Sequence, residues 1–137
     1  MTCIFCKIAS GEIPSEKVIE NERAFAFLDV KPLVKGHVLV IPKRHAERVT
    51  DMPPEDASAV MELAQHVIRR LEGGMGIQGV TVAFNDGRPA GQEVLHAHMH
   101  IVPRSETDGV GPIHRLFKAQ ARLREGELRE IGVRLRG

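Results

Sequence analysis

The chain has 137 residues, 42% hydrophobic and 27% charged, which fits one globular domain with a sizeable core. Its net charge of +1 gives no global field that favours nucleic acid or an acidic membrane, so we expect neither partner. The N-terminal MTCIFCKIASGEIP lacks the basic and apolar regions of a signal peptide, and no apolar run approaches the roughly 20 residues of a membrane span. We therefore expect a cytoplasmic protein.

Short apolar runs separated by turn residues predict an α+β domain. The expected elements are a helix over residues 4–9, strands over 18–21, 24–29 and 37–42, a long helix from residue 54 to about residue 71, strands over 80–84 and 93–103, and a helix over 127–135. This order predicts a mostly antiparallel sheet with the long helix and the C-terminal helix packed on it. We expect a single domain over 1–137, with its core over about 3–104 and a C-terminal extension over 105–137.

The long helix is predicted by an apolar stripe with helical spacing. The stripe consists of Ala57, Val60, Met61, Ala64, Val67, Ile68 and Leu71. Pro54 precedes Glu55 and Asp56 at the start, a pattern typical of a helix N-terminus, and Gly73-Gly74 predicts the end. His66 lies off the stripe, so we expect it in solvent.

Cys3 and Cys6, the only cysteines, have a Cys-x-x-Cys spacing with several interpretations. A structural disulfide is disfavoured in a reducing compartment. A thioredoxin-like redox pair usually follows a strand and opens a helix, whereas this pair lies almost at the N-terminus. Half of a zinc site, completed by two histidines, and two inert thiols are the interpretations that stay open.

Three histidines alternate with apolar residues in VLHAHMHIVPR, residues 94–104. In a strand, His96, His98 and His100 share one face, and the other face carries Leu95, Ala97, Met99 and Ile101. Three unpaired imidazoles are costly to bury together, which argues against an ordinary structural role. The pattern indicates either a metal site or nucleophilic and acid–base chemistry on an anion such as phosphate.

The segment from His96 to Val102 resembles the His-φ-His-φ-His-φ-φ motif, φ being apolar, of the histidine triad (HIT) superfamily of nucleotide hydrolases and transferases. The rest is similar to its Hint-like bacterial branch, with CIFCKI and GEIP first, then AFLD, GHVLVIPKRH, NDG and AGQEV. The resemblance extends from residue 3 to about residue 104. It implies a HIT-like fold and a homodimer.

The resemblance also implies attack on the α-phosphorus of a purine nucleotide, an AMP phosphoramidate or ester, through a nucleotidyl-histidine intermediate and without an organic cofactor. By position, His98 would be the nucleophile, and the backbone carbonyl of His96 would fix its tautomer. His100 would donate to the phosphate or the leaving group, and His37 would support this network. These four histidines are the expected catalytic set.

Further positions are implied for substrate binding. Asp29 would accept from the ribose hydroxyls, and Phe27, Leu28 and Val30 would line the base slot. Asn85 and Gln92 would contact phosphate or bridging oxygens. Backbone N–H groups of Gly91, Gln92, Glu93 and Val94 would approach the phosphate and stabilise its charge.

Some bacterial members of this branch bind a structural zinc ion. The matching residues are Cys3, Cys6, His45 and His96, a closed Cys2His2 set without a position for water. In this interpretation the ring of His96 binds metal rather than phosphate.

Three alternatives to a phosphoramidase stay open: a diadenosine polyphosphate hydrolase or phosphorylase, a zinc-dependent hydrolase, and a non-catalytic nucleotide-binding protein. The chain also departs from the family pattern. Glu93 stands where animal Hint enzymes carry a serine, and there is no tryptophan. Residues 104–137 carry eight Lys and Arg against five Asp and Glu, which indicates a solvated helix face or a segment that steers anions.

Overall fold

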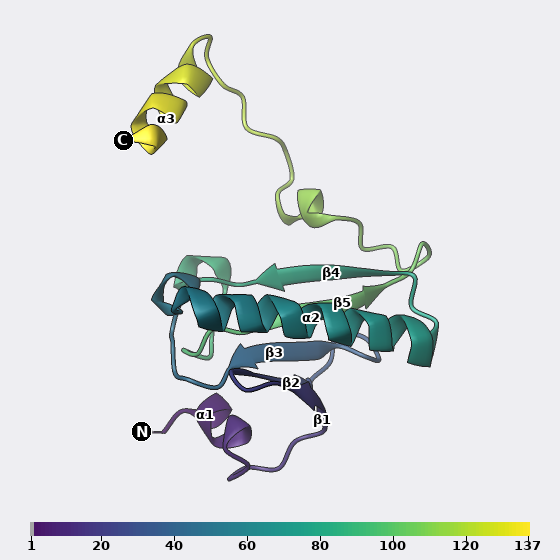
Figure 1. Ribbon diagram of the computed structural model, residues 1–137. Helices are drawn as coiled ribbons and strands as arrows, with labels where there is room; N and C mark the ends of the chain where they lie inside the picture. The colour runs from purple at the N-terminus through teal and green to yellow at the C-terminus, as the bar shows by residue number, and fades with distance from the viewer. Residues whose placement is uncertain (1) are drawn as a thin grey trace. The chain divides into compact units, whose positions relative to one another are not determined.

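The computed structural model describes residues 2–137, which divide into two compact units at residues 107 and 108. The first unit is the expected α+β domain, an open five-stranded sheet crossed by one long helix (Figure 1). None of the helices in residues 2–137 is long and apolar enough to cross a membrane.

The sheet of the first unit is antiparallel throughout. The elements are α1 (Ile4–Ala9), β1 (Lys17–Glu20), β2 (Ala24–Leu28), β3 (Val38–Pro42), α2 (Pro54–Met75), β4 (Gly79–Phe84) and β5 (Met99–Arg104). The strand order is β1-β2-β3-β5-β4, and each neighbouring pair is antiparallel. The crossover through α2 therefore places the last strand between β3 and β4.

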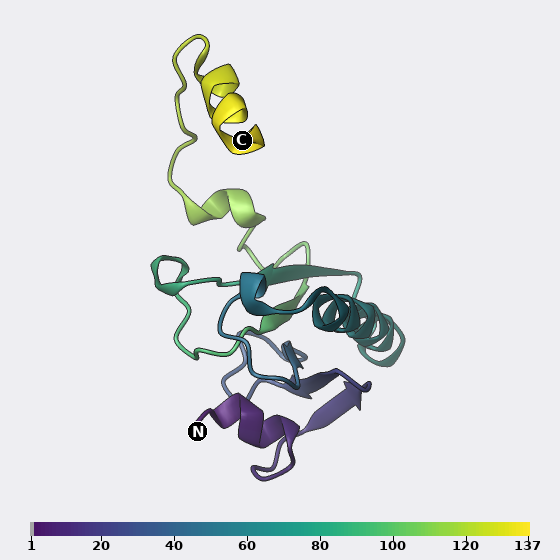
Figure 2. The same ribbon diagram turned by 60° about the vertical axis from the view of Figure 1, so that its left-hand side comes forward.

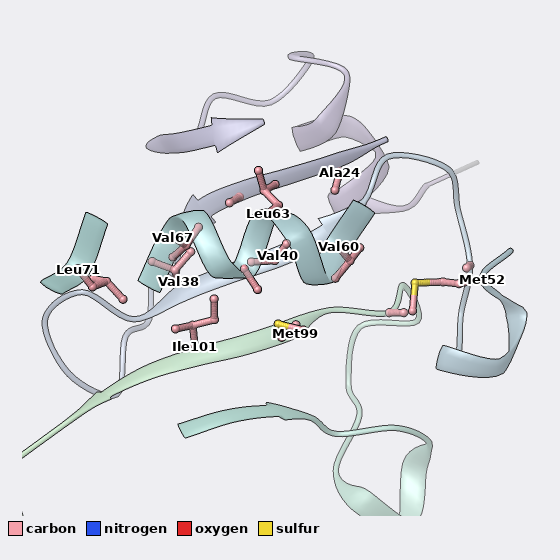
Figure 3. Packing of buried hydrophobic residues seen from close by; sticks show 14 residues of the cluster. Ala24, Val38, Val40, Met52, Val60, Leu63, Val67, Leu71, Met99 and Ile101 are labelled. Carbon is pink, nitrogen blue, oxygen red and sulfur yellow. The ribbon is translucent and has the colours of Figure 1, made fainter. Parts of the chain in front are cut away.

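One face of the sheet packs against α2 (Figure 3). Strand alternation gives this face its apolar side chains, among them Ala24, Ala26, Val38, Val40, Met99 and Ile101. The helix contributes Val60, Leu63, Val67 and Leu71, all less than 9% exposed. Figure 2, which shows α2 nearly along its axis, places the helix on one side of the strands.

The other face carries a second, smaller cluster. Phe5 and Ile8 of α1 pack there against Phe25, Phe27, Leu39 and Ile41. His100 pairs with Leu39 across β3 and β5, whereas its neighbours Met99 and Ile101 belong to the core under α2. Because side chains alternate along a strand, the third histidine of the triplet lies on the face of the sheet opposite α2.

α2 is longer than predicted. It begins at Pro54, as expected, but continues through both glycines to Met75, so the predicted stop at Gly73-Gly74 was wrong. An added Cβ at either glycine would meet nothing within 4 Å, so the cost there is only glycine's intrinsic helix propensity. Gly76 follows Met75 and caps the helix; its φ of 67° is left-handed and available to glycine without steric cost.

The predicted stripe of α2 needs one correction. Met61 is 52% exposed, whereas Leu63, which the stripe omitted, is 1% exposed. Met61 follows Val60 directly and is therefore rotated by about 100° from the centre of the buried face, while Leu63 lies three residues from Val60. His66 is exposed, as predicted.

β5 begins at Met99, so the predicted strand over 93–103 was wrong in its first half. Further along β3, Pro42 has no N–H to donate to a continued ladder. Its carbonyl oxygen instead accepts a hydrogen bond from His96 Nε2 at 2.8 Å. His96 and His98 lie in an irregular segment that leads into the strand.

The second unit, residues 108–137, contains a 3-10 turn (Ile113–Leu116) and the helix α3 (Glu127–Arg136), close to the predicted 127–135. Its large apolar side chains are mostly exposed; Phe117 and Leu135, for example, are 79% and 81% exposed. This unit therefore has no hydrophobic core of its own.

Candidate active site

The His98 ring is fixed by the main chain. Its Nδ1 lies 2.7 Å from the carbonyl oxygen of His96. A carbonyl oxygen only accepts hydrogen bonds, so Nδ1 holds the hydrogen and Nε2 of the neutral ring keeps its lone pair. Phe5 packs edge-on against the ring, with centroids 5.1 Å apart. His98 therefore offers Nε2 as a nucleophile in a defined tautomer and orientation.

A second chain of hydrogen bonds fixes the tautomers of His37 and His100. The N–H of Leu33 donates to His37 Nδ1 at 3.1 Å, so in neutral His37 the hydrogen is on Nε2. This Nε2 lies 2.9 Å from His100 Nδ1 and donates to it. The remaining hydrogen of His100 is then on Nε2, which is buried and has no partner in residues 2–137.

This arrangement makes His100 Nε2 a hydrogen-bond donor ready for a ligand. A buried donor without a partner costs about 1–3 kcal/mol, which an acceptor on a bound ligand would recover. The rings of His98 and His100 lie 5.1 Å apart, so one anion can contact both. The pair can therefore place a nucleophilic nitrogen and an N–H donor at the same phosphate.

The electrostatics keep the chain of imidazoles neutral. The pKa of His100 is lowered to about 4, mainly by burial and further by the neighbouring His98 and His37, against the opposing effect of Asp29. Burial also lowers the pKa of His37, partly offset by Asp29, whose Oδ2 lies 3.7 Å from His37 Nε2. Both rings are thus uncharged at neutral pH, as the hydrogen-bond directions require.

We expect the stability of the fold to decrease as the pH falls below about 6.5, the ordinary pKa of histidine. Between pH 6.5 and about pH 4, the unfolded chain binds a proton at His100 that the folded chain does not. The contribution of neutral His100 to the free energy of unfolding is therefore fully present above pH 6.5 and is lost as the pH falls toward 4. The loss for His100 is at most about 3 kcal/mol. Thermal unfolding from pH 7.5 to 4.5 in chelator-containing buffer measures it.

The matched variants for this titration are His100→Asn and His66→Asn. The slope of Tm against pH should become shallower in His100→Asn, whereas the exposed His66 should leave it unchanged. Equal slopes in the wild type and His100→Asn would contradict the assignment of the titration to His100.

The cysteines and two histidines form a separate cluster. Cys3 Sγ lies 3.4 Å from His96 Nδ1, and Cys6 Sγ lies 3.4 Å from His45 Nδ1 and 3.5 Å from His96 Nδ1. All four potential ligand atoms lie within 4.8 Å of one another. Tetrahedral zinc, with bonds of about 2.3 Å to sulfur and about 2.0–2.1 Å to nitrogen, brings its ligands to comparable separations.

The tautomer of His96 fits a metal ligand. Its Nε2 donates to the Pro42 carbonyl, which leaves the lone pair of Nδ1 facing the two thiols. The pKa of Cys6 is raised to about 11, mainly by burial and also by the hydrogen bond and charge of Cys3. Redox-active cysteines have lowered pKa values, so this environment disfavours a redox pair, whereas a bound cation would stabilise the thiolates.

Asp29, His37 and His100 form another group whose ligand atoms lie within 4.8 Å of one another. Here the hydrogen-bond direction opposes a metal ion. Because Leu33 N–H donates to His37 Nδ1, Nε2 of the neutral ring holds a hydrogen and has no lone pair for a cation. The two histidine clusters therefore differ chemically, one suited to a metal and the other to an anion.

The residues expected around the nucleoside lie at the end of β2 and just beyond it. Phe27 is 3% exposed and packs against Phe5, with ring centroids 5.6 Å apart. Leu28 and Val30 are 39% and 87% exposed. The Oδ1 of Asp29 accepts a hydrogen bond from the N–H of Lys31, which is 2.9 Å away. The structure thus brings Asp29 beside His37 and leaves Val30 largely accessible.

The loop before the triplet presents fewer free N–H groups than expected. The N–H of Gly91 donates to Arg88 at 2.9 Å, and that of Gln92 donates to Gly87 at 3.2 Å. The N–H groups of Glu93 and Val94 have no acceptor within the described part of the chain. Asn85, at the start of the loop, is exposed.

The resemblance implied that the Gln92 side chain contacts phosphate or bridging oxygens. In the structure this side chain bonds to other groups of the protein. The side chain is buried, and its oxygen and both amide hydrogens bond to backbone groups of the protein.

Several contacts in the site were not anticipated from the sequence. Phe5 contacts the rings of both His98 and His96, and its position between the two cysteines of CIFC was the available signal. The N–H of Leu33 and the carbonyl of Pro42 set histidine tautomers. These are main-chain groups, so no side-chain pattern could identify them.

Comparison with known proteins places the chain in a family. The HIT domain model matches residues 10–107. The adenosine 5'-monophosphoramidase of Saccharomyces cerevisiae is 43% identical over 109 residues, 79% of this chain and 66% of the yeast protein.

Two solved structures are also similar. A HIT family member from Bacillus subtilis has a TM-score of 0.87 and 39% identity, covering 98% of this chain and 95% of that one. A zinc-bound histidine triad protein from Mycobacterium smegmatis has a TM-score of 0.76 and 39% identity, covering 81% of both chains. The geometry, the domain match and these relatives agree, and the chain belongs to the HIT family.

Proposed function

We propose that this protein hydrolyses AMP phosphoramidates or related AMP esters through a nucleotidyl intermediate on His98. The observation that carries the proposal is the hydrogen bond from His98 Nδ1 to the His96 carbonyl, which places the lone pair of the neutral ring on Nε2. The similarity to the yeast adenosine 5'-monophosphoramidase supports the substrate class.

In the first step, His98 Nε2 attacks the α-phosphorus. A phosphorus–nitrogen bond forms to the imidazole, and the bond from phosphorus to the leaving amine breaks. The amine takes the electron pair and leaves after gaining a proton from solvent. His100 Nε2–H donates to a phosphate oxygen or to the departing nitrogen, and the free N–H groups of Glu93 and Val94 stabilise charge on the remaining oxygens.

In the second step, water attacks the same phosphorus atom. The bond from phosphorus to His98 breaks, its electron pair returns to Nε2, and AMP is released with loss of a proton from the water. The covalent route divides one difficult displacement into two easier ones. Because Nδ1 stays bonded to the His96 carbonyl, the ring keeps its orientation through both steps.

Nucleoside binding is assigned to the end of β2. Asp29 would accept from the ribose hydroxyls, and Phe27, Leu28 and Val30 would contact the base. The combination of one buried and two accessible apolar side chains beside a carboxylate supports this assignment. Asn85, exposed at the start of the following loop, would contact phosphate or bridging oxygens.

We also propose that Cys3, Cys6, His45 and His96 hold a structural zinc ion. The separations of their ligand atoms and the tautomer of His96 support it, as does the zinc-bound relative from Mycobacterium smegmatis. When bound, the ion would link the N-terminal helix to the segment that precedes the nucleophile. The proposed reaction uses no group of this ion.

Mass spectrometry tests the proposed function. The purified protein is mixed with an adenosine phosphoramidate, quenched at early times and digested. We expect a mass increase of one adenylyl group that maps to His98, and that forms and decays as AMP is released.

Each rival function gives a different result in this experiment. AMP release without an adduct, abolished by a chelator, would overturn the proposal in favour of a zinc-dependent hydrolase. Nucleotide binding without AMP release would indicate a non-catalytic binding protein. Faster adduct formation from a diadenosine polyphosphate than from the phosphoramidate would keep the mechanism and change the substrate.

A further inference from the structure

The side chain of Gln92 bonds to three backbone groups, two in its own loop and one on a segment that is distant in the sequence. Its Oε1 accepts from the N–H of Gly87 at 2.8 Å. Its Nε2 donates to the carbonyl oxygens of Glu47 at 2.7 Å and Val94 at 3.0 Å. The residue is 6% exposed, so these bonds form away from solvent, where they are strongest.

The same loop is closed by its own backbone. The N–H of Gln92 donates to the carbonyl of Gly87 at 3.2 Å, so the two residues are joined in both directions. Gly87 and Gly91 both have a φ of 94°, a left-handed conformation that favours glycine. The side chain of Gln92 thus stabilises a turn that requires glycine at two positions.

The loop has a second anchor on the segment after Glu47. Asp86 accepts from the N–H of Val49 at 2.8 Å and pairs with Arg48 at 3.1 Å. The Arg48–Asp86 pair is half exposed on the arginine side and contributes little stability. Gln92 is the buried anchor of the two, and it alone reaches Val94.

Val94 connects this anchor to the reaction centre. It lies two residues before His96, whose carbonyl sets the tautomer of His98. The N–H groups of Glu93 and Val94, free in the described part of the chain, lie in the same short segment. Fixing the Val94 carbonyl therefore fixes the peptide units that hold both the nucleophile and the anion-stabilising groups.

We infer that Gln92 is a positioning residue for phosphoryl transfer rather than a substrate ligand. The inference rests on the proposed function. The side chain holds the segment 93–96 so that its N–H groups and the His96 carbonyl meet the phosphate and His98 at the required places. Misplacing such groups weakens transition-state stabilisation more than ground-state binding, so the effect should fall on kcat.

Two substitutions separate the parts of this contact. Gln92→Met keeps the length of the side chain and removes all three hydrogen bonds. Gln92→Glu keeps an acceptor for the Gly87 N–H but removes the donors to Glu47 and Val94. Gln65→Met is the matched control, because Gln65 is exposed on α2.

Both Gln92 variants should lower kcat by about 10²–10³-fold, the range measured when one anion-stabilising donor is lost. KM and the dissociation constant of AMP should change less than about threefold, because the nucleoside contacts assigned to β2 are separate from this loop. Gln65→Met should leave all three constants unchanged. Steady-state kinetics and AMP titration measure these values.

Hydrogen exchange at the Gly87 amide gives a readout independent of turnover. We expect faster exchange than wild type in Gln92→Met and near-wild-type exchange in Gln92→Glu, which retains the acceptor. If Gln92→Met does not fold, Gln92→Glu still tests the two donors through kcat.

The outcomes distinguish this inference from the proposed function. A wild-type protein that forms no adduct and releases no AMP would overturn both. An active wild type whose Gln92 variants keep their kcat would overturn this inference alone, as would a rise in KM and in the AMP dissociation constant with kcat unchanged, which would identify Gln92 as a substrate ligand.

Discussion

His98→Ala should abolish AMP release from an adenosine phosphoramidate, with kcat reduced at least about 10⁴-fold. The variant removes Nε2 of His98, whose lone pair is left free by the hydrogen bond from Nδ1 to the His96 carbonyl, whereas the free Nδ1 of His96 faces the two thiols. His100 cannot replace His98, because its Nδ1 accepts from His37 and its Nε2 holds a hydrogen. Single-turnover kinetics and mass spectrometry of the adduct measure the loss.

The fold of His98→Ala should stay intact. His98 is only partly buried, and its one aromatic neighbour on α1, Phe5, also packs against Phe27. Thermal unfolding should therefore change by a few degrees at most, and His66→Ala, on the exposed face of α2, should retain full turnover. Turnover that persists in His98→Ala would rule out the nucleotidyl-histidine mechanism.

Removing zinc should lower Tm by on the order of 10 °C. Metal that binds only the folded state stabilises it by about 4 kcal/mol at a thousandfold excess over its dissociation constant, and 1 kcal/mol corresponds to several degrees in a domain of this size. The ion would link α1 to the segment before β5, so its loss leaves α1 held to the sheet by the packing of Phe5 and Ile8. Calorimetry with and without chelator measures the shift.

The variant His45→Asn provides the matching test, with His66→Asn as its control. Elemental analysis should find one zinc per chain in the wild type and in His66→Asn, and much less in His45→Asn. The chelator should have no further effect on the Tm of His45→Asn. Equal metal content in all three proteins, or a wild type that binds no zinc, would contradict the assignment.

Local sequence patterns predicted most of the fold. Short continuous apolar runs located β2 and β3 to within a residue, because strands that are buried on both faces carry such runs. The helical stripe placed the start of α2 at Pro54. The resemblance around the histidine triplet named Cys3, Cys6, His45 and His96 as one set, and the structure brings their ligand atoms together. The homodimer, the cytoplasmic location and the packing of the C-terminal helix stay predictions.

Other features depended on contacts between distant segments. The stop of α2 moved to Gly76 because the glycines before it lie in open space, where a helix tolerates them. β5 started late, and the residues before it bond to other segments: the His96 ring bonds to the Pro42 carbonyl, and the N–H of Ala97 donates to the Ala46 carbonyl. Neither outcome is visible in a local pattern, since each depends on what lies beside the residue.

The sequence by itself determined which chemistry-bearing residues are present: three alternating histidines, a Cys-x-x-Cys pair, and the glycine-rich loop before them. Only the tertiary structure decided what each can do. The N–H of Leu33 and the carbonyls of Pro42 and His96 select the histidine tautomers. Gln92, expected at the phosphate, bonds to backbone groups instead. Tautomer and hydrogen-bond partner depend on main-chain groups that every residue shares, so they are set by the fold and not by residue type.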